Sequence, residues 1–137
     1  MKKVERQVEV LLESLIECAN IEKVIESLPR GYISVKNISG HTYYYRQWRE
    51  GSKVVSCYVP ESYLNVVKQK IEIRKQNEEL LKILKADYRK AEKQVLKSGS
   101  LTQEQINNAK NHINSLSEEE LLNRREVVQN LIDQLLD

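Results

Sequence analysis

The side chains that could perform acid–base or nucleophilic chemistry are scattered along this sequence rather than grouped. His41 lies in a predicted turn and His112 on the polar face of a predicted helix, with no HxxxH, HExxH or DxD motif nearby. A hydrolase or transferase needs convergent groups, such as a nucleophile beside a base. The four glycines occur singly, so no phosphate-binding loop is visible. We therefore predict a protein that is not an enzyme and that uses no metal or cofactor.

The two cysteines, Cys18 and Cys57, are 39 positions apart and belong to no CxxC pair. This spacing indicates neither a disulfide framework nor a zinc knuckle. Reduced thiols are typical of the cytoplasm. No apolar run approaches the roughly 20 residues that cross a bilayer. The sequence predicts a cytoplasmic protein that does not bind a membrane.

Tyrosine is the most unusual residue type in the chain. There are seven Tyr, one Trp and no Phe, so every aromatic ring carries a polar group, as at surfaces where one end of the ring is wet. Rings beside cations suit stacking on nucleic-acid bases. Two other interpretations stay open: cross-strand aromatic pairs that only stabilise an exposed sheet, and a docking surface for a protein. The candidate binding residues are Lys36, Tyr43, Tyr45, Arg46, Arg49, Lys53 and Tyr58.

Charge is distributed unevenly, although the net charge is only +2. Residues 29–60 carry five basic and one acidic side chain, and residues 61–98 carry ten basic and six acidic ones. Both ends of the chain are net acidic. A polyanion should therefore contact the middle of the chain.

Hydrophobic spacing predicts the secondary structure. A stripe with three- and four-residue steps over residues 4–28 predicts a helix that ends before Pro29. Alternation over residues 32–59 predicts three antiparallel strands, with turns at Ser39-Gly40 and Glu50-Gly51.

The turns determine the strand register, because the first pairs Val35 with Tyr44 and the second pairs Arg49 with Ser52. Two faces result. The face expected to pack on helices carries Ile33, Val35, Tyr44, Trp48, Val55, Cys57 and Val59. The opposite face carries Tyr32, Ser34, Lys36, Tyr43, Tyr45, Gln47, Arg49, Ser56 and Tyr58.

A second long helix is predicted over residues 61–98. Two capping boxes, Thr102 with Gln105 and Ser117 with Glu120, predict helices over about 103–114 and 118–136. The predicted fold class is α+β: a three-stranded antiparallel sheet packed on long helices, with a C-terminal helical hairpin. We expect residues 1–98 to form one domain and residues 99–137 to pack on it or extend it.

Two stretches, LPRGYISVK at 28–36 and YYYRQWREGSKVVSCYVP at 43–60, resemble a family of small uncharacterised bacterial proteins. Such proteins are common in Firmicutes and are often linked to mobile elements. The shared pattern is a leading helix, a Tyr-rich hairpin around an Arg-Glu-Gly turn, and a charged trailing helix. The resemblance covers residues 20–85 and implies no established activity. The helical tail at 99–137 lies outside the pattern.

These observations predict a non-enzymatic binding protein, a nucleic-acid-associated accessory factor of a mobile element. Its partner would be nucleic acid or a nucleic-acid-handling protein. One alternative is a phage or mobile-element inhibitor that binds a host defence nuclease, in the manner of anti-CRISPR proteins. Another is a self-associating helical scaffold, a homo-oligomer that uses the apolar stripe over residues 80–95.

Overall fold

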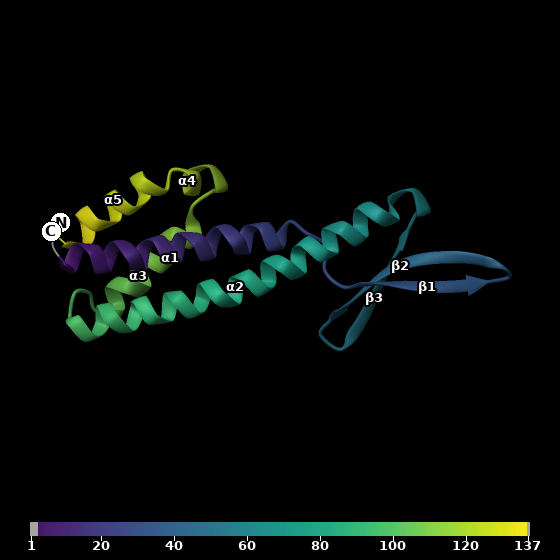
Figure 1. Cartoon of the computed structure of the whole chain (residues 1–137), viewed down its shortest axis with the longest axis horizontal. Helices are drawn as coiled ribbons and strands as arrows, with labels where there is room; N and C mark the ends of the chain where they lie inside the picture. The colour runs from purple at the N-terminus through teal and green to yellow at the C-terminus, as the bar shows by residue number, and fades with distance from the viewer. Residues whose placement is uncertain (1–2, 137) are drawn as a thin grey trace. The chain divides into compact units, whose positions relative to one another are not determined.

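The computed structural model describes residues 3–136, and Figure 1 shows the order of their helices and strands. The α+β class, the antiparallel sheet and the C-terminal helical segment are as predicted from the sequence. In chain order the elements are α1 (Lys3–Glu26), β1 (Tyr32–Ile38), β2 (His41–Glu50), β3 (Lys53–Val59), the 3-10 turn η1 (Glu61–Tyr63), α2 (Leu64–Ser98), α3 (Gln103–Ser115), α4 (Glu118–Leu122) and α5 (Arg124–Leu136).

The chain divides into two compact units, and both long helices contribute to each of them. Unit 1 comprises Met1–Lys23 and Glu79–Asp137, and unit 2 comprises Val24–Glu78. The division into 1–98 and 99–137 predicted from the sequence stays a prediction. No helix in the described part of the chain is long and apolar enough to cross a bilayer.

Unit 1 is a helical bundle around one apolar core. α1 supplies one side of this core and the helices after residue 79 supply the rest. Its buried residues are Val8, Leu11, Leu12, Leu15, Ile16, Cys18, Ala19, Tyr88, Ala91, Val95, Leu101, Ile106, Ala109, Ile113, Leu116, Leu121, Val128 and Leu131. Tyr88, Ala91 and Val95 of the apolar stripe over residues 80–95 are therefore buried in the core of unit 1. The tail after residue 99 is an integral part of this core.

Both predicted capping boxes are present. The Thr102 hydroxyl accepts a hydrogen bond from the Gln105 N–H at 3.2 Å, and the Gln105 side chain accepts one from the Thr102 N–H at 2.9 Å. Ser117 and Glu120 repeat this arrangement at 3.2 and 3.0 Å. Each box satisfies two backbone donors at a helix start.

The helix predicted over 118–136 is interrupted at Asn123. This residue leaves helical geometry at φ −92° and ψ 59°. Its carbonyl accepts a hydrogen bond from the Val127 N–H at 3.1 Å, the first such bond of α5. Asparagine suits this position because it tolerates non-helical backbone and is favoured where helices begin.

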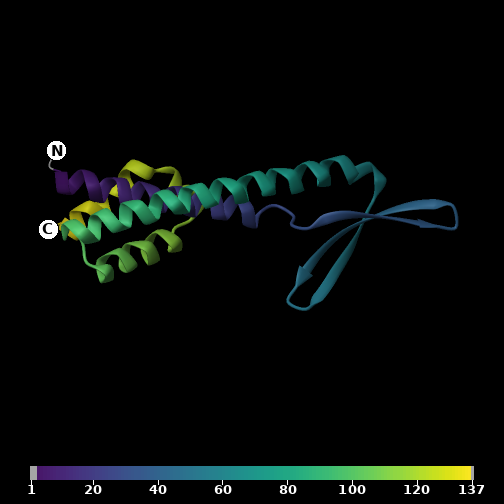
Figure 2. The ribbon, with the colours of Figure 1, turned by 60° about the horizontal axis from the view of Figure 1, so that its bottom comes forward.

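β2 is the central strand of the sheet, whose order is β1-β2-β3. The predicted pairing of Val35 with Tyr44 is confirmed. β1 pairs with residues 41–47 of β2, whereas β3 pairs with residues 44–50. The sheet is therefore three-stranded only over residues 44–47 of β2, and its two hairpin tips point in different directions (Figure 2).

The predicted register of the second hairpin is wrong by two residues. Glu50 pairs with Lys53, so the loop is Gly51-Ser52 rather than Glu50-Gly51. Gly51 has a φ of 60° and is the first loop residue, where a type II′ turn requires a positive φ. Because side chains alternate with a period of two, this shift leaves every residue on its predicted face.

Replacing Gly51 with valine should lower the stability of unit 2 by about 1–2 kcal/mol, because the left-handed conformation costs an L-residue about that much. A Cβ here would meet no atom within 4 Å, so the expected cost comes from the backbone conformation and not from a clash of this atom. Thermal unfolding followed by the fluorescence of Trp48 measures the loss. An unchanged midpoint would contradict the Gly51-Ser52 turn.

The apolar face of the sheet is covered less than expected. Of the seven residues predicted to pack on helices, only Val59 is buried, while Val35 and Cys57 are exposed and the other four are half-buried. Little of the rest of unit 2 is buried either: among its described residues, the other buried apolar side chains are Ile25 of α1 and Ile71 of α2.

Candidate functional site

One face of the sheet brings together four tyrosines, a histidine and two cations. We call it the tyrosine face. Its members follow from the alternation along each strand and from the observed register. They are Tyr32, Ser34, Lys36 and Ile38 of β1, His41, Tyr43, Tyr45, Gln47 and Arg49 of β2, and Val54, Ser56 and Tyr58 of β3.

A cluster of rings and one ammonium group lies in the middle of the tyrosine face. Tyr45 of β2 is paired with Tyr58 of β3, and their ring centroids are 5.9 Å apart with the planes at 67°. The Lys36 Nζ lies 4.9 Å from the centroid of the Tyr45 ring, within range of a cation–π interaction. Toward the first hairpin tip, the His41 and Tyr43 rings are 6.4 Å apart. Aromatic surface and positive charge therefore coincide.

Hydrogen bonds across all three strands hold the tyrosine face together. The Tyr32 hydroxyl donates to Gln47 Oε1 at 3.0 Å, and the Gln47 Nε2 donates to the Ser56 hydroxyl at 3.4 Å. Tyr32 and Tyr58 still expose 54% and 55% of their surface. The rings are thus positioned by neighbours and remain open to a ligand.

The charge of this region is positive. The tyrosine face carries Lys36 and Arg49 and, in the strands that the structure describes, no Asp or Glu. Unit 2 as a whole contains nine Lys or Arg against five Asp or Glu. Polyanions are attracted to such a surface.

Arg46 and Lys53, also predicted to bind, lie on the opposite face of the sheet. Lys53 pairs with Glu50. The Arg46 guanidinium lies 3.9 Å from the Trp48 ring centroid, and its Nη1 donates to the carbonyl of Arg30 at 2.7 Å. The guanidinium group of Arg46 is therefore already engaged in contacts within the protein. The structure brings together five of the seven predicted binding residues and separates these two from them.

Trp48 is half-buried beneath Arg46 rather than buried against a helix. Its indole N–H donates to Glu50 Oε1 at 3.0 Å, and Glu50 is ion-paired with Arg30 at 3.2 Å. The hydrogen bond from Trp48, and then the charge of Arg30, hold the pKa of the Glu50 carboxyl below its ordinary value. These contacts fix the segment that leads into β1.

Arg74 of α2 connects α2 to the C-terminal end of α1 within unit 2, an interaction that sequence analysis did not predict. Its Nη1 donates to the carbonyls of Ile25 at 2.9 Å and Leu28 at 2.6 Å, at the C-terminal end of α1. Cations stabilise the carbonyls of a helix C-terminus. Nothing in the sequence distinguishes Arg74 from the other basic residues of α2, because the two carbonyls that it contacts are more than 40 positions away.

The cysteines and other potential metal ligands do not form a cluster. Cys18 is buried in the core of unit 1, whereas Cys57 is exposed on β3. Burial raises the pKa of the Cys18 thiol. Among the described residues, no three His, Cys, Asp or Glu side chains gather where they could hold a metal ion.

The comparison with known families identifies the N-terminal half of the chain. A family described as a domain of unknown function, DUF6788, matches residues 1–69. The match includes α1, all three strands and therefore the whole tyrosine face, whereas α3, α4 and α5 lie outside it. No curated protein and no solved structure matches the chain. Since the match covers half of its 137 residues, the chain belongs to the DUF6788 family.

Proposed function

We propose that this chain is a non-enzymatic binding protein whose tyrosine face holds single-stranded nucleic acid. The observation that carries the proposal is the cluster of Tyr45, Tyr58 and Lys36, in which paired rings lie within 5.9 Å and an ammonium group within 4.9 Å. Ring faces can stack on bases while Lys36 and Arg49 contact phosphates. Single strands are favoured over duplex, because a base must be unpaired to stack on a side chain.

We further propose that this binding serves an accessory role in a mobile element. Support comes from the resemblance of residues 28–60 to bacterial proteins linked to such elements. An inhibitor of a host defence nuclease would use the same tyrosine face as a protein-docking surface. That function becomes the better proposal if the face binds no nucleic acid.

Binding of a fluorescein-labelled oligothymidine, measured by fluorescence anisotropy, tests the proposal. Tyr45→Ala and Tyr58→Ala should each weaken binding by about 1–3 kcal/mol, the value of one stacked base. Two phosphate contacts predict that log Kobs falls with log salt at a slope of about −1.4. The double change Lys36→Glu with Arg49→Glu should abolish both the binding and its salt dependence.

Lys53→Glu is the matched control, because it reverses one charge on the same sheet but on the opposite face. It should weaken binding much less than Lys36→Glu. Equal losses in the two variants would indicate general attraction to a basic unit rather than a site on the tyrosine face. If the unmodified protein shows no anisotropy change even at low salt, the proposed function is wrong.

A further inference from the structure

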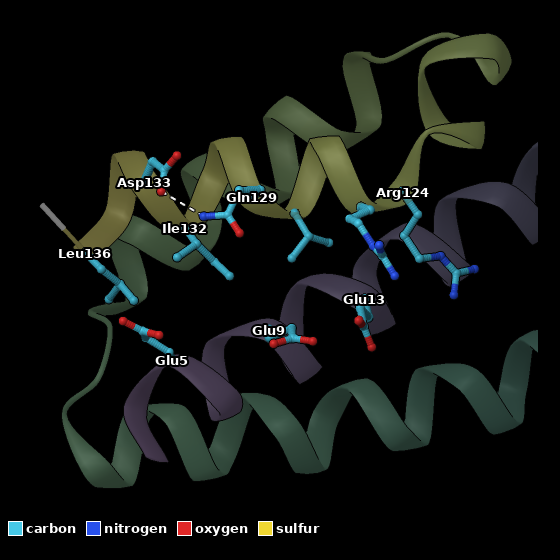
Figure 3. A pocket seen from close by; sticks show the side chains of 10 residues that line it. Glu5, Glu9, Glu13, Arg124, Gln129, Ile132, Asp133 and Leu136 are labelled. Carbon is cyan, nitrogen blue, oxygen red and sulfur yellow. Dashed lines mark hydrogen bonds between the residues drawn. The ribbon is translucent and has the colours of Figure 1, made fainter. Parts of the chain in front are cut away.

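A groove runs between α1 and α5 within unit 1. The two helices are antiparallel: Glu5 and Leu136 line one end of the groove, and beyond the other end Glu17 is ion-paired with Arg124 at 3.2 Å. The groove encloses about 590 Å³ (Figure 3). This volume is within the range of ligand-binding clefts.

One wall of the groove is acidic and the other contributes apolar surface. Glu5, Glu9 and Glu13 follow one another at four-residue steps along α1, so they rise by about 6 Å from one to the next. All three are half-buried. Among the described residues only Glu9 of the three has an ion-pair partner, Arg6 at 3.3 Å. Ile132 and Leu136 of α5 lie beside this row of carboxylates and are half-buried (Figure 3).

The charge changes sign along the groove. Asp133 of α5 also lines the groove, toward the end formed by Glu5, and its carboxylate accepts a hydrogen bond from Gln129 at 2.9 Å (Figure 3). Arg124 lies at the opposite end, near Glu13 (Figure 3). Arg125, the next residue of α5, also lines the groove. A ligand that fits this pattern is positive over most of its length and negative at one end.

We propose that this groove is the docking site for a cationic amphipathic helix of a partner protein. Lysine or arginine side chains of the ligand contact Glu5, Glu9 and Glu13, and its apolar stripe covers Ile132 and Leu136. Its C-terminal end lies toward Arg124 and Arg125, because the carbonyls of a helix C-terminus carry partial negative charge.

The ligand is a helix rather than a strand, because both walls are helices whose backbone groups are already hydrogen-bonded. Addition of a strand needs an exposed sheet edge, whereas an amphipathic helix needs only an apolar groove with complementary charge at its borders. The row of glutamates also excludes nucleic acid, since it repels phosphates. This surface is therefore distinct from the tyrosine face. α1, one wall of the groove, lies within the residues that match the family, whereas α5, the other wall, lies outside them.

A synthetic helix of Leu, Ala and Lys tests the proposal with the full-length protein. A labelled peptide of about 16 residues spans roughly 24 Å, slightly more than α5. It should bind saturably in a fluorescence anisotropy titration. The triple change Glu5→Gln, Glu9→Gln and Glu13→Gln should weaken binding about tenfold, since three partly exposed ion pairs are lost. Amidation of the peptide's C-terminus should weaken binding by a smaller factor.

The matched control removes three exposed carboxylates elsewhere in unit 1, by Glu79→Gln, Asp87→Asn and Glu104→Gln. This variant should bind the peptide like the unmodified protein, and a scrambled peptide of the same composition should bind weakly. Equal losses in both triple variants, or equal binding of the scrambled peptide, would overturn the proposal. So would self-association of the unmodified protein in sedimentation that the Glu5, Glu9 and Glu13 changes abolish, because a second copy would then occupy the groove. Equal binding of the amidated peptide would overturn the assigned orientation.

Discussion

Gly31→Ala should destabilise unit 2 more than alanine at any of the other three glycines. Gly31 has a φ of 102°, and an added Cβ would lie 2.0 Å from the carbonyl oxygen of Gln47 and 3.0 Å from the Cβ of Trp48. The conformation alone costs about 1–2 kcal/mol. The contact with Gln47 involves backbone in the central strand, so relief requires β2 to move. We expect a total loss of more than about 3 kcal/mol.

The fluorescence of Trp48, the only tryptophan in the chain, reports on unit 2 during unfolding. Gly40→Ala is the matched control, because Gly40 also has a positive φ, 80°, but a Cβ there would meet no atom within 4 Å. That change should cost only about 1–2 kcal/mol. Similar losses in the two variants would mean that the close approach of Gly31 to Gln47 has no effect on stability.

Leu121→Ala should destabilise unit 1 by about 2–5 kcal/mol, the usual cost of truncating a fully buried leucine. Leu121 is 1% exposed and belongs to the core that α1 also lines, whereas its neighbour Leu122 is 82% exposed. Leu122→Ala should therefore cost less than about 0.5 kcal/mol. Leu121 and Leu122 are adjacent leucines of the same helix, so the two variants differ mainly in the burial of the truncated side chain.

Denaturant unfolding followed by circular dichroism compares the two leucine variants, because the signal comes mainly from helices. If Leu121→Ala unfolds at the same denaturant concentration as the unmodified protein, the short helix α4 does not pack on the core. Equal destabilisation by both variants would instead point to a loss of helix propensity. A larger loss of stability in Leu121→Ala than in Leu122→Ala would show that residues after position 99 are needed to complete the core of unit 1.

The faces of the sheet could be predicted from the sequence because they depend only on alternation. The register of the second hairpin was wrong by two residues, yet Tyr45 and Tyr58 still lie on the same face, since a shift of two preserves the side of each residue. The capping boxes were also predictable, because Thr102 and Ser117 contact groups only three positions away. Local chemistry is sufficient for such features.

Features that depend on distant partners could not be predicted in this way. Arg46 was expected to contact a ligand, but its guanidinium is hydrogen-bonded to the carbonyl of Arg30 and stacked on Trp48. The break at Asn123 was missed because the apolar spacing from Leu121 to Val128 continues through it. The limited burial of the sheet could not be predicted, because alternation shows which face is apolar and not whether other elements pack on it.

The order of the strands leaves two outer edges in the described sheet, since β1 and β3 each pair only with β2. Unpaired edges are templates for strands of other molecules and promote aggregation. Val35, Ile38 and Val54 on these strands are at least half exposed, which adds to the hazard. Lys36 and Lys53 lie on the same two strands, where their charges oppose edge-to-edge pairing of copies. The charges on β1 and β3 thus counteract the edge pairing that their exposed apolar side chains favour.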